Sequence, residues 1–550
     1  MTELRRTANG FAVASEIRSL ARPLTGPADL DPLVDRVGAS RFVGIGEASH
    51  GTHEYYRWRA ELSRRLIEEH GFRWIGVEGD WPDCWRINRW VRGQDDQDLD
   101  AFGMLAHFER WPTWMWANEE VADFLGWLHQ WNLARPEQAR VGFYGLDVYS
   151  LWDSLRKIIS WLEINAPDAV PTAVRAWLCF VPYREDPQEY AWSTRLVPET
   201  CEADVVDLLV EVRRRTSRLA VDDEAAFDAA QNAEVAANAE HYYRIMVRGN
   251  RESWNIRDHH MADTIDRLAR HHGPRSKGLI WEHNTHIGDA RATDMAREGL
   301  TSVGQLIRER HGRDGVALIG LASHRGSVLA TDAWGTPERV LPVPPARQGS
   351  HEDVLHRTLG APAVLAFDDD RSGPWLSGRL GHRAIGVVYR PTSELGNYVV
   401  TRMGGRYDAL IWLEQPPRYA RCTTNSARQN PNPRQNRPDS DRDAPGQLLS
   451  WPFRSWKNTT EVCRTRFAFA VANLVAQSPP VAFRGILLEI EEVLRHPVLV
   501  TRTASVRRRR HADSPRPSLG SAPRLAPQGF EDAAGLGLGR RTFRSRSAGG

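Results

Sequence analysis

Carboxylate and imidazole side chains follow three short apolar segments that have the composition of buried strands. Glu47 and His50 come directly after the first segment, and Glu78 lies at the end of the second. His283 and His286 follow another such segment, far later in the chain. Ligands of open α/β sheets bind outside the carboxyl ends of the strands. We therefore expect these loops to bring all five side chains into one cleft.

This combination of side chains is suited to hydrolysis with water as the nucleophile. A neutral imidazole beside a carboxylate can take a proton from water, because the carboxylate fixes the ring tautomer and stabilises the imidazolium. A second histidine or an arginine can stabilise the oxyanion that forms. The cluster therefore predicts acid–base chemistry on a bond that water can cleave.

Motifs for competing chemistries are absent from the sequence. There is no GxSxG nucleophile elbow, and neither a GxxxxGK[ST] loop nor a GxGxxG fingerprint follows a predicted strand. Ser49 precedes His50, but adjacent residues after a strand usually point apart. No HExxH motif occurs either, so metal binding by the His and Glu side chains is a secondary hypothesis.

Three further side chains are candidates for binding the substrate. Asp147 ends another apolar segment and is expected at the rim of the cleft. Trp114 and Trp116 belong to a cluster with Trp111 that could line a substrate mouth. Core packing is the expected role for at least two of these three rings.

Short apolar segments alternate with helical stretches up to about residue 414. This order predicts an α/β fold: βα crossovers, a mainly parallel sheet and flanking helices. The segment 198–272 is almost entirely helical in pattern, and we interpret it as an insertion or cap. The predicted strands cover 41–46, 73–78, 141–147, 277–282, 315–321, 363–367, 384–388 and 407–413.

The composition narrows the class of protein. The chain has 550 residues, with 72 basic against 70 acidic residues, so a strongly basic nucleic-acid binder is not indicated. No segment approaches the ~20 apolar residues that span a bilayer, and no secretory signal is recognisable. Five scattered cysteines fit a reducing cytoplasm better than a disulfide scaffold. We therefore expect a cytoplasmic protein with neither a nucleic-acid nor a membrane partner.

The end of the chain differs from the rest. Only three residues are Lys, which we interpret as GC-rich coding bias. Residues 416–550 are rich in Arg, Pro and Ser, which predicts a low-complexity tail that is disordered or a run-on translation.

Six short blocks together resemble the erythromycin esterase family, over residues 14–415. The blocks are 46–51, 77–80, 145–150, 255–258, 282–287 and 349–352. The resemblance is to the broad bacterial branch of the family, which includes succinoglycan-biosynthesis-like members. It implies an α/β fold with a helical subdomain and an ester hydrolase that uses no metal or other cofactor.

The resemblance also implies a role for each candidate side chain. His50 would be the general base, and Glu47 and Glu78 would orient His50 and the water. The side chains that would stabilise the oxyanion are His283, His286 and Arg59. Arg57 is a close rival to Arg59 for the arginine of the site.

The expected partner is a small-molecule ester or lactone, with macrolides among the possible substrates. Two alternatives stay open. The same His and Glu side chains could serve a metal-dependent hydrolase. Alternatively, the Trp-rich cleft could belong to a non-catalytic protein that binds a hydrophobic small molecule, with inert histidines or histidines that bind a cofactor such as haem.

Overall fold

A central eight-stranded sheet organises the computed structural model, which describes residues 2–414 apart from 96–98, 198, 220–222, 249 and 368–369. The strand order is β1-β9-β12-β6-β2-β5-β3-β4. The strands are β1 (Ala21–Pro23), β2 (Phe42–Ile45), β3 (Trp74–Asp80), β4 (Gly142–Asp147), β5 (Gly278–Trp281), β6 (Val316–Ser323), β9 (Ala363–Ala366) and β12 (Ala409–Leu413).

Six neighbouring strands of the sheet, from β12 to β4, run parallel to one another. At the other end, β9 is antiparallel to both β12 and β1. The prediction of an α/β fold with a mainly parallel sheet is therefore confirmed. Two small hairpins lie outside it: β7 (Gly326–Ala330) pairs with β8 (Arg339–Val343), and β10 (Arg379–Arg383) pairs with β11 (Tyr398–Arg402).

One predicted strand is wrong. Residues 384–387 are buried and Val388 is half-buried, but this apolar run forms only isolated bridges from Ile385 to Ser49 and from Val388 to Thr331. The neighbouring strand is β10, which ends at Arg383. A short buried apolar run indicates burial and not a strand ladder, since loop backbone can satisfy its polar groups equally well.

Helices connect the strands and cover the sheet. They are α1 (Thr2–Leu20), α2 (Asp31–Val37), α3 (His53–His70), α4 (Trp81–Val91), α5 (Ala101–Leu105), α6 (Glu119–Leu133), α7 (Leu151–Asn165), α8 (Val170–Phe180), α9 (Pro187–Leu196), α10 (Glu202–Thr216), α11 (Glu224–Met246), α12 (Asn250–His271), α13 (Asn284–Ile287), α14 (Val303–His311), α15 (His351–Leu359) and α16 (Met403–Arg406).

Two hydrophobic cores cover the two faces of the sheet. Alternate strand residues point to opposite faces, so Leu279 and Trp281 of β5 pack with α3 and α6, whereas Ile280 packs with α12 and α14. On α12, Met261, Ile265 and Leu268 recur at helical spacing and form the buried stripe. Because α12 lies against the sheet, its first half reaches the carboxyl edge where the predicted site residues lie.

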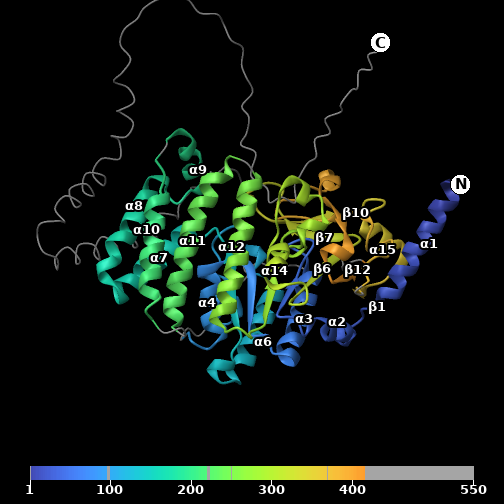
Figure 1. Cartoon of the computed structure of the whole chain (residues 1–550), viewed down its shortest axis with the longest axis horizontal. Coiled ribbons are helices and arrows are strands. Elements are labelled where there is room, and N and C mark those ends of the chain that lie inside the picture. The colour runs from blue at the N-terminus through green and yellow to red at the C-terminus, as the bar shows by residue number, and fades with distance from the viewer. Residues whose placement is uncertain are drawn as a thin grey trace, which may run out of the picture. The chain divides into compact units, whose positions relative to one another are not determined.

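The predicted helical segment is confirmed and forms part of a larger helical cluster. Residues 198–272 contain α10, α11 and α12. Helices α7 to α11 share a third hydrophobic core, which includes Leu155, Leu208 and Ala236. Figure 1 shows α11 and α12 side by side, so α12 joins this cluster to the sheet.

The cysteine expectation needs a correction. Cys179, in the last turn of α8, forms a disulfide with Cys201, which directly precedes α10. Cys84 is buried and unpaired. The two partners are 22 residues apart in a helical segment, so their pairing depends on how α8 and α10 pack. Cys422, Cys463 and the predicted low-complexity tail lie outside the described residues.

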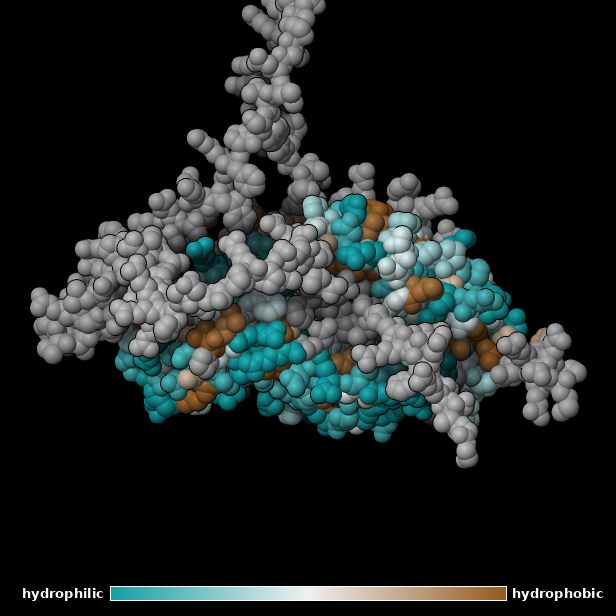
Figure 2. Space-filling view, turned by 90° about the horizontal axis from the view of Figure 1, so that it is seen from above, coloured by the Kyte–Doolittle hydropathy of each residue, from teal (hydrophilic) through white to brown (hydrophobic). Residues whose placement is uncertain are grey.

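The described surface is mostly hydrophilic in the view of Figure 2, with apolar areas that are separate from one another. Exposed apolar side chains include Trp192, Leu196 and Val210 in the helical cluster. Scattered apolar residues of this kind are normal for globular proteins. Within the described residues, no helix combines the length and apolarity needed to cross a membrane.

Candidate active site

His50 and Glu47 form the first of two His–carboxylate pairs at the carboxyl edge of the sheet. The tight loop between β2 and α3 carries both residues, and Glu47 Oε1 lies 3.0 Å from His50 Nδ1. A carboxylate can only accept, so Nδ1 carries the proton and Nε2 is the basic nitrogen. The loop passes so close to β7 that a Cβ at Gly51 would lie 1.9 Å from the Leu329 carbonyl oxygen.

Arg59, not Arg57, reaches this pair. Arg59 Nη2 lies 3.3 Å from Glu47 Oε2, and the guanidinium is fully buried. It lies over the rings of Trp281 at 4.9 Å and Trp116 at 5.6 Å, in cation–π geometry. Arg57 is exposed. Arg59 is therefore located to hold the Glu47 side chain in position.

Glu78 is held on both of its carboxylate oxygens. Oε2 accepts a hydrogen bond from the backbone N–H of His283 (2.8 Å), and Oε1 accepts one from Arg257 Nη2 (2.7 Å). Burial raises the pKa of Glu78, but the positive charges of His286 and Arg257 outweigh it and lower that pKa well below its ordinary range. Glu78 is therefore an ionised anchor for the loop after β5.

Arg257 connects Glu78 to Asp147, which lies at the end of β4. Its Nε and Nη2 atoms donate to the two carboxylate oxygens of Asp147 at 3.0 and 2.7 Å. Burial opposes ionisation of Asp147, but the guanidinium lowers the pKa of this carboxyl. Asp147 thus lines the cleft as the partner of an arginine, and not as an unoccupied acceptor for substrate.

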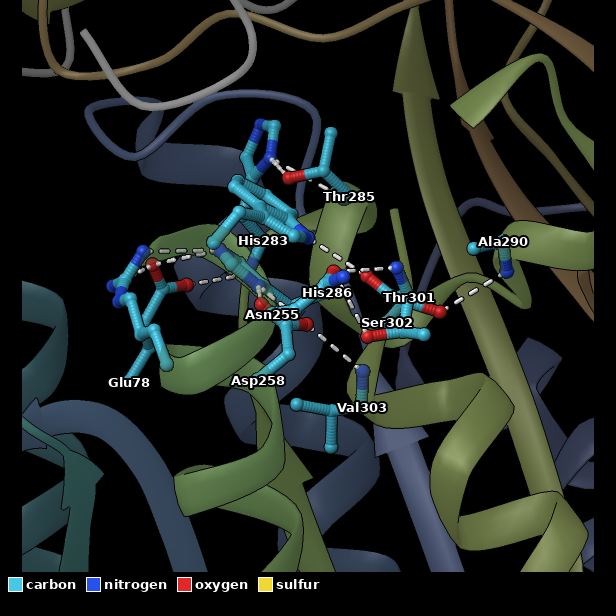
Figure 3. A network of polar contacts seen from close by, with 12 residues as sticks. Glu78, Asn255, Asp258, His283, Thr285, His286, Ala290, Thr301, Ser302 and Val303 are labelled. Atoms are coloured by element: carbon cyan, nitrogen blue, oxygen red, sulfur yellow. Dashed lines mark hydrogen bonds and ion pairs between the residues drawn. The ribbon is translucent and has the colours of Figure 1, made fainter. Parts of the chain in front are cut away.

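His286 and Asp258 form the second His–carboxylate pair (Figure 3). His286 Nδ1 lies 3.0 Å from both carboxylate oxygens of Asp258, and its ring stacks on Trp254 with centroids 4.4 Å apart. Its Nε2 atom is 3.5 Å from Glu78 Oε1. Burial lowers the pKa of His286, but Asp258 and Glu78 together raise it above its ordinary value.

His283 has the opposite electrostatic character. Its Nδ1 atom accepts the backbone N–H of Thr285 at 3.3 Å, which places the proton of the neutral ring on Nε2. Burial and the nearby His50 hold the pKa of His283 well below its ordinary value. The ring also interacts with the backbone of Ala48, and its centroid lies 4.9 Å from that of His50. A neutral imidazole ring thus lies beside the general-base candidate.

A cleft opens beside Glu78 and Arg257. Its other lining residues include Asp80, Asp83, Phe108, Arg110, Met115, Trp116, Asp147, Tyr149 and Trp334. Trp116 lines the cleft and donates its indole N–H to the Glu78 carbonyl oxygen at 2.8 Å. Trp114 is buried in the hydrophobic core and is not among the residues that line this cleft, so its role in substrate binding stays a prediction.

A metal-binding arrangement is not preformed here. Within the described parts of residues 2–414, no group of three or more His, Cys, Asp or Glu side chains is placed to hold a metal ion. The candidate ligands instead pair with arginines or with one another. The geometry is that of side chains arranged to move and stabilise protons and charge.

Comparison with known proteins decides the family. The sequence model of the family described as "Erythromycin esterase" matches residues 67–415, more than half of the chain. The chain belongs to the erythromycin esterase family. The chain is also 32% identical over 121 residues to the Escherichia coli protein "Erythromycin esterase type II". That match spans 22% of the chain and 26% of the relative, so the chain covers about a quarter of the relative's length.

Solved structures share the fold of this esterase-family chain. A Bacillus cereus protein is similar with a TM-score of 0.63 and 19% identity, over 74% of this chain and 97% of that one. A succinoglycan biosynthesis protein gives a TM-score of 0.59 at 19% identity, over 73% and 96%. A mutant of the erythromycin esterase EreC in its open conformation gives 0.55 at 16%, over 73% and 97%.

The residues of the site that follow strands were predicted from the sequence, whereas those contributed by helix α12 were not. Glu47, Glu78 and His283 lie together because β2, β5 and β3 are adjacent parallel strands. Arg257 and Asp258 come from α12, where no strand end marks them. Their only signal was their place in the block 255–258 of the family resemblance.

Proposed function

We propose that the chain hydrolyses carboxylic ester bonds, macrolide lactones being one candidate class, with water activated by His50 and without a metal. The observation that supports this most is the position of His50 between the Glu47 carboxylate and the ring of His283, which burial and His50 keep neutral. The first pair supplies a base with a fixed tautomer. The second ring supplies a neutral donor where negative charge would develop.

In this mechanism, His50 Nε2 takes a proton from a water molecule whose oxygen bonds to the ester carbonyl carbon. The carbonyl oxygen gains negative charge and accepts a hydrogen bond from His283 Nε2. The bond between the carbonyl carbon and the alcohol oxygen then breaks, and the alkoxide takes the proton from the His50 imidazolium. The products are an acid and an alcohol, or one hydroxy acid if the substrate is a lactone.

The remaining side chains support these two rings. Glu47 orients His50 and stabilises its imidazolium, and Arg59 holds Glu47. Glu78 fixes the backbone of His283, and Arg257 keeps Glu78 ionised beside the positive charge that forms on His50. Of the roles expected from the sequence, that of Arg59 changes, because its contact is with Glu47 and the surrounding rings and it is fully buried.

Water is favoured over Ser49 as the nucleophile. Ser49 Oγ lies 2.5 Å from Thr52 Oγ1, and Ser49 lines a separate small cavity with Tyr55 and Arg383. The cleft beside Glu78 does not separate the two candidates, because its lining includes neither Ser49 nor His50; of the five side chains expected in one cleft, only Glu78 lines this one. A serine nucleophile would need its hydroxyl within hydrogen-bond reach of the His50 base.

A hydrolysis screen tests the proposal. The purified chain is incubated with erythromycin-type lactones and with simple aliphatic and aryl esters, and the products are identified by mass spectrometry. We expect at least one lactone or ester to be hydrolysed, at the same rate before and after treatment with EDTA. Loss of activity on chelation and its return with Zn²⁺ or Fe²⁺ would establish the metal-dependent alternative. A ligand-induced melting shift across the panel without turnover would establish the binding-protein alternative.

A further inference from the structure

Asn284 lies between the two site histidines of the loop after β5 and is fully buried. Its side chain makes a two-point contact with the backbone of β6. Nδ2 donates to the Leu321 carbonyl oxygen at 2.8 Å, and Oδ1 accepts from the Leu321 N–H at 3.4 Å. The amide therefore pairs with β6 much as a residue of a neighbouring strand would.

This contact crosses a strand. In the sheet, β2 lies between β5 and β6, so the Asn284 side chain reaches β6 by passing over the end of β2. The residue at that point is Gly46, where a Cβ would lie 2.1 Å from Asn284 Oδ1. Any side chain at position 46 would displace the amide, so the end of β2 is shaped around Asn284.

The backbone of Asn284 is fixed as well. Its N–H donates to the carbonyl oxygen of Glu47 at 2.8 Å. Its carbonyl oxygen accepts from Arg406 Nη2 at 2.9 Å. One residue thus holds the loop of Glu47 and His50, the loop of His283 and His286, and β6 in a single arrangement.

We propose that Asn284 is the positioning residue that sets the placement of the His283 ring relative to His50. This inference rests on the proposed function for its catalytic consequence, but its geometric part can be tested without any substrate. Misplacing a reacting group by about 1 Å can reduce the rate ~10²-fold. A side chain that locks both loops is therefore expected to affect turnover more than substrate binding.

Asn132 provides a matched control. It is also fully buried, and its Nδ2 donates to the carbonyl oxygens of Val91 and Val141 at 2.9 Å each. Its Oδ1 accepts from the Val141 N–H at 2.8 Å. Val141 precedes β4, so Asn132 makes the same kind of contact at the opposite edge of the sheet.

The test compares Asn284→Ala with Asn132→Ala on the ester or lactone that the wild-type chain hydrolyses fastest. We expect both variants to melt at lower temperature, and only Asn284→Ala to lose ~10- to 10²-fold in kcat with a nearly unchanged KM. Asn284→Asp keeps the size of the side chain but replaces the donor with an oxygen that faces the Leu321 carbonyl oxygen. We expect this variant to lose at least as much kcat as Asn284→Ala, and it takes the place of the alanine variant if that variant does not fold. Equal kcat losses at positions 284 and 132 would overturn the proposal.

A second readout does not depend on activity. The ring resonances of histidines labelled with ¹³C at Cε1 are followed against pH, with His50 and His283 assigned from their glutamine variants. In Asn284→Ala, or in Asn284→Asp, the His283 titration should move toward that of an ordinary histidine, whereas Asn132→Ala should leave it unchanged. If no ester is hydrolysed, the proposed function fails while this titration still tests Asn284. An unchanged His283 titration in a folded position-284 variant would overturn the inference itself.

Discussion

Glu47 Oε1 lies 3.0 Å from His50 Nδ1, and both side chains are buried at the end of β2. This contact leads to the first prediction. Glu47→Gln keeps the size of the side chain but removes the charge that stabilises the His50 imidazolium. We expect kcat to fall by ~10²-fold or more, within the range that general acid–base catalysis contributes. Steady-state kinetics on the best ester of the screen checks this, with circular dichroism to confirm folding. A Glu47→Gln variant with wild-type kcat would show that the pair is structural only.

The second prediction concerns the stability that Arg257 provides. Replacing it with Gln leaves the buried carboxylates of Glu78 and Asp147 without their shared partner. Breaking a buried ion pair in this way costs about 3–5 kcal/mol of unfolding free energy. The control is Arg156→Gln, which removes exposed pairs with Asp153 and Glu185 and should cost under about 1 kcal/mol for each pair. Urea unfolding of both variants measures these costs. Equal losses of unfolding free energy would contradict a stabilising role of the buried Arg257 ion pairs.

The third prediction follows from the raised pKa of His286, whose ordinary value is 6.5. The folded state binds this proton more tightly than the unfolded state does. The resulting stability is therefore fully present below pH 6.5 and is lost as the pH rises through the higher folded-state pKa. We expect the unfolding free energy of the wild-type chain to fall relative to that of His286→Gln between pH 6 and 9. The measurement is urea unfolding of both chains at a series of pH values. If the unfolding free energy of the wild type minus that of His286→Gln stays constant or grows as the pH rises, the prediction is wrong.

The fourth prediction concerns the mouth of the cleft. Trp334 lines the cleft, contacts Trp111 and is 41% exposed. Trp334→Ala should raise KM for a large lactone several-fold while leaving the melting temperature nearly unchanged. Trp192 is the matched control, because it is 52% exposed but lies on α9, away from the cleft. Equal KM values for the two variants and the wild type would show that Trp334 does not contact the substrate.

The site residues that follow strands could be predicted because each lies directly after an apolar run that is visible in the sequence. Glu47 and Glu78 follow apolar runs, and parallel strands place their ends at one edge. Arg257 and Asp258 could not be predicted in this way. They lie in a helix, and which of its side chains reach the sheet edge depends on how α12 packs through Met261 and Ile265.

Two other features depended equally on tertiary packing. Trp116 lines the cleft and Trp114 does not. The two residues are only two positions apart, and the sequence does not show which of their rings reaches the cleft. The Cys179–Cys201 disulfide forms because α8 ends near the start of α10. In both cases the sequence contains the residues, but their partners are set by how separate elements pack against one another.

The most direct test of the account compares two adjacent residues, His50 and Ser49. The measurement is kcat/KM of His50→Ala and Ser49→Ala on the ester or lactone that the wild-type chain hydrolyses, with the melting temperature of each variant. If His50 activates water, His50→Ala loses ~10²–10⁴-fold while staying folded, and Ser49→Ala stays within a few-fold of the wild type. Full activity in His50→Ala, or abolished activity in a folded Ser49→Ala variant, would contradict the mechanism.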